Sequence, residues 1–216
     1  MKLLLISLLI VTSLVLFCNY FLDAQIALAV YQTMDNHERL ENYTSNIPDL
    51  LFYIVCIVTL VSWLAYFLLK NKAEKHALFF QVVALCVPAA YGTKIILKLV
   101  FGRVNTKTWL HHPYLYGFHW LHGGRIFDGF PSGHMTIFTT LLLALSHFYP
   151  RYWKFSVGAL VLLAVALVTT DYHFLSDVIA GAYLGVIVYI FTCISVTKFN
   201  EMKKRSFLRT QQPRKF

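Results

Sequence analysis

Six long runs of apolar residues, separated by polar segments, constrain the fold of this chain more than any other feature of its sequence. Each run approaches the roughly 20 residues that a helix needs to cross the hydrocarbon core of a bilayer, although the fourth and fifth runs are short. Of the 216 residues, 58% are hydrophobic and only 13% are charged, which is too apolar for a soluble globular protein. We therefore predict an all-α polytopic membrane protein whose six transmembrane helices form one bundle, at residues 3–22, 50–69, 77–101, 132–149, 155–170 and 178–197.

The first apolar run could be a cleaved signal peptide, because Lys2 supplies a minimal positively charged start. We favour a retained helix, since the run is longer than the apolar part of a usual signal peptide and no small-residue cleavage pattern follows closely. The four cysteines all lie within apolar runs, which indicates packing and not a disulfide framework or a zinc site. The predicted organisation is a membrane domain at residues 1–197 and a basic cytoplasmic tail at residues 198–216.

The net charge of +9 is distributed as expected for a membrane protein whose N-terminus is cytoplasmic. That orientation places Lys2, the basic residues within 70–75 and 151–154, and the basic tail on the cytoplasmic side. The outer segment 23–49 then carries only Arg39 against several acidic residues, as the positive-inside rule requires. We therefore assign the charge to topology and not to nucleic-acid binding. Both termini are expected in the cytoplasm, with contact between the tail and anionic lipid as a modest extension.

A polar segment opens the fourth apolar run, at residues 129–134 (GFPSGH). Its glycine and proline interrupt the preceding structure, so Ser132 takes the N-cap position of the helix that follows. The backbone N–H groups of the first turn then lack intrahelical partners, and a helix start of this kind attracts anions. The segment also supplies Gly133 and a histidine, His134. It therefore predicts a cradle for an anionic ligand beside an ionisable side chain.

A second polar segment, residues 172–177 (YHFLSD), precedes the sixth run. His173 and Asp177 are four positions apart, so on a helix the carboxylate lies over the imidazole and orients it. Taken alone, this pair or His134 could be a structural hydrogen-bonding group. The predicted topology brings both histidines to the outer membrane face. An oriented histidine, a second histidine and an anion cradle at one face indicate phosphoryl chemistry.

Two lysines, Lys94 and Lys98, interrupt the third apolar run near its outer end. One interpretation is snorkelling, in which the aliphatic stems lie in the hydrocarbon core and the ammonium groups reach the interface. The other is a functional role, because ionisable residues within membrane spans mark functional sites by default. Pro88 and Gly92 are expected to kink or loosen this helix. The spacing of four places the two lysines on one helix face.

The longest outer loop, residues 102–131, is rich in histidine and aromatic residues. One interpretation is a lid whose basic side chains face a phosphorylated headgroup: His111, His112, His119, His122 and Arg125. Its larger aromatic side chains would then rest on the lipid: Trp109, Tyr114, Tyr116 and Trp120. The alternative is an interfacial aromatic belt with incidental histidines. We disfavour a metal site, since the loop has no paired histidine spacing on a helix and no nearby carboxylate cluster.

With these residues in place, the sequence resembles the type 2 phosphatidic acid phosphatase superfamily, the integral-membrane relatives of vanadium haloperoxidases. The similarity covers about residues 94–185 and rests on two intact motifs, Pro-Ser-Gly-His at 131–134 and His-x-x-x-Asp at 173–177. Pro-Ser-Gly-His alone is a weak signal, but the two motifs at one membrane face form a strong one. The segment 98–103 (KLVFGR) also looks like the family's first motif.

Two arginines of the family's pattern are absent. The spacing of the first motif puts its arginine at Asn105, and the spacing of the third puts its arginine at Leu167. Each charge-assisted contact to phosphate is worth on the order of 1.5–3 kcal/mol, so the loss is large. Three explanations are open. Arg103, Lys107 or Arg125 supplies the charge; the phosphate carries less charge, as a diester does; or the chain has lost catalysis.

The resemblance implies roles for the remaining residues. His173 would attack phosphorus, Asp177 would orient it, and His134 would act as general acid and base. The substrate phosphate would be held by Lys98, Arg103, Ser132 and Gly133. Neither a metal nor another cofactor is expected.

The leading interpretation of function is hydrolysis of a lipid phosphate or diphosphate through a phospho-histidine intermediate. Substrates in this class include phosphatidic acid, phosphatidylglycerophosphate, a polyprenyl diphosphate and lipid A. The first alternative is a lipid headgroup or phosphate transferase of the same superfamily, and the second is a catalytically degenerate membrane binding protein. We expect a bacterial inner membrane protein with its site facing the periplasm, by topology and family analogy.

Overall fold

The computed structural model describes residues 2–33 and 47–210. These ranges are helical apart from short connections and one isolated bridge, Arg103 with Phe118. In chain order the elements are α1 Lys2–Phe17, the π-helix η1 Cys18–Leu22, α2 Asp23–Thr33, α4 Ile47–Leu69, α5 Glu74–Phe101, α6 Thr106–His111, the 3-10 turns η2 Pro113–Leu115 and η3 Arg125–Phe127, α7 Gly133–Phe148, η4 Pro150–Tyr152, α8 Trp153–Thr169 and α9 Leu175–Thr210. The predicted all-α class is confirmed.

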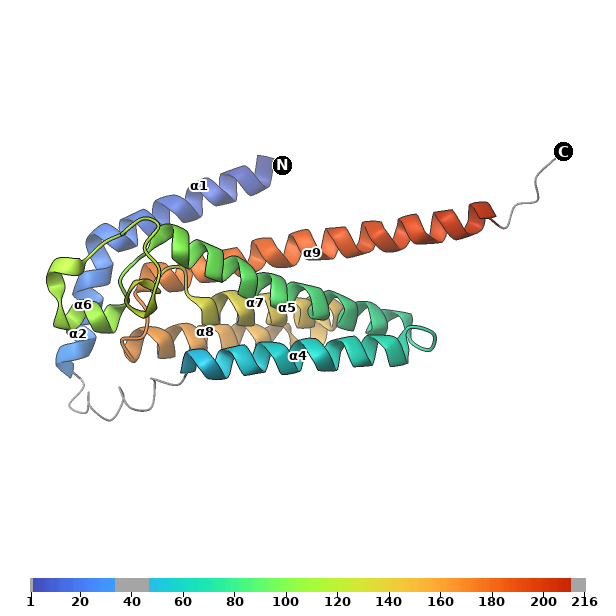
Figure 1. Ribbon diagram of the computed structural model, residues 1–216, viewed down its shortest axis with the longest axis horizontal. Coiled ribbons are helices and arrows are strands. Elements are labelled where there is room, and N and C mark those ends of the chain that lie inside the picture. The colour runs from blue at the N-terminus through green and yellow to red at the C-terminus, as the bar shows by residue number, and fades with distance from the viewer. Residues whose placement is uncertain (1, 34–46, 211–216) are drawn as a thin grey trace.

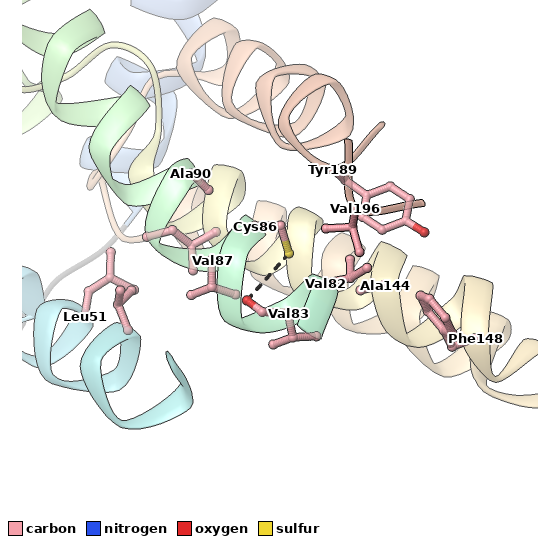
Figure 2. Packing of buried hydrophobic residues seen from close by; sticks show 12 residues of the cluster. Leu51, Val82, Val83, Cys86, Val87, Ala90, Ala144, Phe148, Tyr189 and Val196 are labelled. Carbon is pink, nitrogen blue, oxygen red and sulfur yellow. Dashed lines mark hydrogen bonds between the residues drawn. The ribbon is translucent and has the colours of Figure 1, made fainter. Parts of the chain in front are cut away.

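Helices α4, α5, α7, α8 and α9 form the bundle, with α1 lying along its side (Figure 1). Its main apolar core lies between α4, α5, α7 and α9, where small and β-branched side chains interdigitate (Figure 2). This core includes Leu51, Val82, Cys86, Val87, Ala90, Ile137, Ala144, Phe148, Tyr189 and Val196. Helix α5, which was expected to be kinked or loosened at Pro88 and Gly92, continues through both residues as one helix.

Five helical stretches among the described residues are long and apolar enough to cross a membrane: Lys2–Thr33, Leu50–Leu69, Glu74–Phe101, Pro150–Thr169 and Leu175–Arg205. The fourth predicted span, residues 132–149, corresponds to α7, which is apolar but has only 16 residues. Large apolar side chains on α1 and α4 are exposed, such as Leu9 at 68% and Leu60 at 69%, as expected for surfaces in contact with lipid. The predicted count of six spans is therefore not confirmed, whereas the membrane-protein class is.

The N-terminal helix continues past the predicted end of its span. The π-helix η1 joins α1 to α2, so the outer segment predicted to begin at residue 23 starts as a helix. Asn19 and Asp23 are buried at this junction. Arg39 lies outside the described residues, as does the sequence Asn42-Tyr43-Thr44, which matches the three-residue pattern of a glycosylation site.

The ends of three helices meet at the end of the bundle that holds the 102–131 loop (Figure 1). Helix α5 stops at Gly102, whose left-handed φ of 52° suits glycine. Ser132 is the N-cap of α7, as the sequence predicted. The Ser132 N–H donates to the carbonyl oxygen of Asp177 at 3.0 Å, which fixes the start of α7 against the start of α9.

Two glycines allow α7 and α9 to approach closely. A Cβ atom at Gly181 would collide with the Ser132 carbonyl oxygen, and one at Gly185 would lie 2.6 Å from the Thr136 carbonyl oxygen. The two helices are also joined here by a hydrogen bond from the Thr140 hydroxyl to the Gly185 carbonyl oxygen at 3.1 Å. Helix α9 then continues to Thr210, past the predicted tail boundary at residue 197, and that division of the chain stays a prediction.

The close contact between α7 and α9 yields a stability prediction. We expect Gly185→Ala to lower the free energy of unfolding by about 1–3 kcal/mol, because the added methyl group meets a backbone oxygen that has little room to move. Gly158→Ala on α8 is the matched control, since a Cβ atom there meets nothing within 4 Å and alanine favours a helix by up to about 1 kcal/mol. Thermal unfolding in detergent measures both; equal midpoints for the two variants would contradict the packing described.

Candidate active site

The helix ends described above enclose a cavity of about 330 Å³. Helices α4 and α5 form one wall of the cavity, and the 102–131 loop covers part of the cavity. The first turn of α7 and the connection from α8 to α9 form the remaining walls. The lining residues are Leu51, Lys94, Ile95, Lys98, Leu99, Gly123, Gly124, Phe127, Asp128, Gly133, His134, Tyr172 and His173. The cavity therefore collects both predicted catalytic histidines, two lysines and one carboxylate.

The two histidines face this cavity from different elements. Their ring centroids are 6.5 Å apart, and both side chains are buried except where they meet the cavity. His134 lies in the first turn of α7, whereas His173 precedes α9 and its backbone N–H donates to the Leu167 carbonyl oxygen at 3.1 Å. Both side chains thus face the same cavity.

Tyr172 packs edge-on against both rings, with centroid distances of 5.4 Å to His134 and 5.1 Å to His173. Burial, and to a smaller extent the nearby Asp128 carboxylate, raises the pKa of Tyr172 above its ordinary value. The phenol therefore stays protonated at neutral pH and is able to donate a hydrogen bond into the cavity.

Asp177 lies beside His173, but the two are not hydrogen-bonded. The distance from Asp177 Oδ2 to His173 Nδ1 is 3.7 Å, which is longer than a normal hydrogen bond. The same Oδ2 accepts the Phe174 N–H at 3.0 Å, while His173 Nδ1 has no hydrogen-bond partner. His173 lies before the first residue of α9, so the two side chains are close in space but are not stacked on one helix as the spacing of four predicted.

The two residues of the predicted anion cradle lie differently. Ser132 is fully buried; its hydroxyl accepts the Met135 N–H at 3.5 Å and does not line the cavity. Gly133 does line it, and a Cβ atom there would collide with the stem of Lys94. Glycine at position 133 therefore admits the lysine to the start of α7.

Lys94 and Lys98 both reach the cavity from α5. The Lys94 side chain is buried, with Nζ 4.4 Å from the ring centroid of Tyr91. Lys98 Nζ lies 3.4 Å from an oxygen of Asp128. The sequence identified Lys94 as unusual without assigning it to the site; its spacing of four from Lys98 was the available signal.

Arg103, predicted to bind phosphate, is fully buried and does not line the cavity. Its Nη1 donates to Asp177 Oδ1 at 2.5 Å and to the Ser176 hydroxyl at 2.6 Å. Its Nη2 donates to the side chains of Asn19 and Asp23, at 2.7 Å each. Burial alone would lower the pKa of Arg103, but the two carboxylates outweigh it and raise the pKa, so the guanidinium stays charged.

The positions of the two missing arginines have structural roles. Asn105 is the N-cap of α6, where its Oδ1 accepts the Thr108 N–H at 2.8 Å and its Nδ2 lies 3.4 Å from Asp128 Oδ1. Leu167 packs in an apolar cluster with Met135 and Val178. Neither of the other cations considered as replacements, Lys107 and Arg125, lines the cavity.

The loop predicted to be a lid contributes different residues from those expected. Its cavity-lining members are Gly123, Gly124, Phe127 and Asp128, and none of its four histidines is among them. Among its aromatic residues, Tyr114 and Trp120 are exposed at 81% and 60%, as expected for side chains in contact with lipid. Trp109 is instead buried against Phe174, because it closes a small core beneath the loop.

Comparison with known proteins identifies the family of this chain. Residues 77–201 match the PAP2 superfamily, a range that contains both histidine motifs, most of α5, and all of α7 and α8. The chain is 31% identical over 100 residues to the lipid A 1-phosphatase of Rhizobium johnstonii, and 32% identical over 91 residues to that of Rhizobium etli.

These two alignments cover 46% and 42% of this chain and only 40% and 38% of the relatives, so the chain spans about two fifths of their length. No solved structure gives a significant match. The family match extends over more than half of the chain, and the resemblance inferred from the motifs is thereby confirmed: this chain belongs to the PAP2 superfamily, as an integral membrane protein.

Proposed function

We propose that the chain is a membrane enzyme that hydrolyses a lipid phosphate or diphosphate through a phospho-histidine intermediate, without a metal. The observation that carries this proposal is the single cavity in which His134, His173, Lys94 and Lys98 meet. These two histidines, whose ring centroids are 6.5 Å apart, would supply the nucleophile and the general acid and base for one phosphoryl group. The family relationship supports the same chemistry.

In the first step a ring nitrogen of His173 attacks phosphorus, and the bond from phosphorus to the lipid oxygen breaks. Protonated His134 gives its proton to the departing alkoxide. In the second step His134 removes a proton from water, the water oxygen attacks phosphorus, and the nitrogen–phosphorus bond breaks to release inorganic phosphate and restore His173. Asp177 lies close enough to stabilise the imidazolium form of His173.

The charge that accumulates on phosphorus falls next to two ammonium groups. Lys94 is buried in α5 beside Gly133, so its charge is weakly screened. Together with Lys98 and the first N–H groups of α7, it compensates for the arginines absent at Asn105 and Leu167. Ser132 would support the phosphate indirectly, by fixing the helix start that carries Gly133 and His134.

The substrate is inferred to enter from the lipid. Ile95 and Leu99 line the cavity on α5 and remain about half exposed, at 49% and 50%, so acyl chains could continue along this helix face. We propose that α7 completes six spans, that both termini are cytoplasmic, and that the cavity opens to the periplasm from a bacterial inner membrane. The names of the Rhizobium relatives place lipid A first among the substrates to test.

One observation favours the runner-up, a lipid headgroup or phosphate transferase. Asp128 lies in the same cavity and is paired with Lys98 at 3.4 Å, so the net positive charge around the phosphate is reduced. A phosphodiester carries one negative charge fewer than a fully ionised monoester and matches such a cavity better. In a transferase, His134 would activate an acceptor alcohol instead of water in the second step.

Phosphate release tests the proposal directly. We expect the protein in detergent, without added metal, to release inorganic phosphate from at least one of phosphatidic acid, phosphatidylglycerophosphate, a polyprenyl diphosphate and lipid A. His173→Ala should abolish this release, because it removes the nucleophile. Wild-type protein and His173→Ala giving the same background with every lipid would refute hydrolysis; radiolabelled headgroup appearing on an acceptor lipid would then favour transfer.

The role of Lys94 gives a second prediction. Lys94→Met keeps most of the stem but removes the charge, and we expect kcat/KM to fall about 10- to 100-fold, as the loss of one charge-assisted contact implies. Lys107→Met is the matched control, because Lys107 Nζ lies 5.8 Å from the Tyr172 ring centroid yet does not line the cavity. Equal kcat/KM values for Lys94→Met and wild type would exclude Lys94 from the phosphate site.

A further inference from the structure

We propose that Asp23 and Arg103 are positioning residues that hold Asp177 behind His173, so that the junction of the N-terminal helices is part of the active site. This inference rests on the proposed role of His173 as nucleophile. It assigns a function to a segment that lies outside the region matched to the family, residues 77–201. It also gives Arg103 a task other than binding the substrate phosphate.

A continuous chain of contacts leads from the N-terminal helices to His173. Asp23 Oδ2 accepts Arg103 Nη2 at 2.7 Å, and Arg103 Nη1 donates to Asp177 Oδ1 at 2.5 Å. The second oxygen of Asp177 lies 3.7 Å from His173 Nδ1. The guanidinium therefore occupies one carboxylate oxygen and leaves the other directed towards the histidine.

Asp23 also holds the start of α9. Its Oδ1 accepts the Ser176 N–H at 3.0 Å, and its Oδ2 accepts the Ser176 hydroxyl. A carboxylate from α2 thus caps a helix that begins more than 150 residues later in the chain. Because Asp177 follows Ser176 directly, the same contact fixes the backbone that carries the carboxylate beside His173.

The π-helix η1 aims two side chains at Arg103. Asn19 lies within η1 and Asp23 directly after it, and both accept from Arg103 Nη2. Helical turns of the π type are rare and frequently occur at functional sites. The π-type turn in an otherwise apolar helix is therefore explained by the two hydrogen-bond acceptors, Asn19 and Asp23, that it directs to Arg103.

Stability alone does not account for the buried charges of Asp23, Arg103 and Asp177. The side chains of Asp23, Arg103 and Asp177 are all 0% exposed, and desolvation costs several kcal/mol for each ion. Well-packed apolar residues often stabilise a protein as much as such a group does. The planar guanidinium has fixed donor directions, so it sets the geometry of two carboxylates at once.

Arg103 packs against aromatic rings and does not line the cavity. Its guanidinium carbon lies 4.5 Å from the ring centroid of Phe174 and 5.2 Å from that of Phe118. Its Nε is buried without a hydrogen-bond partner, so the position of the side chain is dictated by the contacts of its two terminal nitrogens. Direct contact between Arg103 and a substrate in the cavity does not fit this arrangement.

Kinetics of Asp23→Asn test the proposal. The variant keeps the shape and an acceptor for Arg103 but removes the charge. We expect kcat to fall about 10- to 100-fold with KM within about twofold, because the substrate contacts are unchanged and only the nucleophile is misplaced. Asn19→Ala removes one weaker contact to Arg103 and should give a smaller loss of kcat. It also serves as the second variant should Asp23→Asn fail to fold.

Ala27→Gly is the matched control for general destabilisation. Ala27 is buried on the same helix, α2, but takes no part in the charge network, and glycine weakens a helix by about 1 kcal/mol. Phosphate release is measured with phosphatidic acid and lipid A at temperatures where both variants are folded. An equal fall in kcat for Ala27→Gly and Asp23→Asn would overturn the positioning role and leave a purely structural one.

The ring signals of His173 give a readout that does not need turnover. In protein labelled with ¹⁵N-histidine, with the signals assigned by His173→Ala, we expect Asp23→Asn to shift the His173 ring nitrogens and Ala27→Gly to leave them in place. Unchanged ring signals in Asp23→Asn would overturn the proposal. Absence of phosphate release from wild-type protein would refute the proposed function, and the ring signals would still decide whether Asp23 positions His173.

Discussion

The hydrogen bond from the Ser132 N–H to the Asp177 carbonyl oxygen is the contact on which the arrangement of the site depends. It joins the N-cap of α7 to the first turn of α9, and one of the two cavity histidines lies at each of these helix starts, His134 within α7 and His173 just before α9. The bond requires the two helices to approach closely, which Gly181 and Gly185 permit. Packing along the bundle thus determines where the two histidines lie relative to each other.

The electrostatics of the site are divided between two layers. Facing the cavity are the ammonium groups of Lys94 and Lys98, with Asp128 moderating the second. Behind it lies the buried group of Arg103 between two carboxylates, which has no access to a substrate. A chain that lacks the family's usual arginines at Asn105 and Leu167 thus still carries three strong cations near its histidines. Of these three cations, Lys94 and Lys98 line the cavity, and Arg103 does not.

Much of this architecture follows from the sequence, for reasons of short range. Apolar runs identified the bundle helices, and Ser132 was recognised as an N-cap from local patterns. His173 and Asp177 were paired by their spacing of four, and they do lie close together, although His173 precedes the first residue of α9. The burial of Arg103 could not be predicted in this way. Its acidic partner Asp23 is 80 residues away in the sequence. The residues around an arginine in a polar loop do not indicate whether its side chain faces the cavity or is buried behind it. The role of Lys94 was ambiguous because a snorkelling lysine and a ligand-binding lysine occupy the same helix position. The sequence does not reveal that Gly133 lies opposite Lys94 and leaves space for its side chain beside the cavity.

Helix α9 has a consequence beyond the site. It has 36 residues, so at 1.5 Å per residue it is about 54 Å long, against roughly 30 Å for the hydrocarbon core of a bilayer. In Figure 1 its C-terminal part projects beyond the rest of the bundle as a straight rod. Electrostatic attraction decays over about 8 Å at physiological ionic strength, so the position of a charge along this rod decides which other charges it interacts with. The helix keeps the basic residues between Lys198 and Arg205 at fixed spacings, whereas a flexible tail would let them move independently.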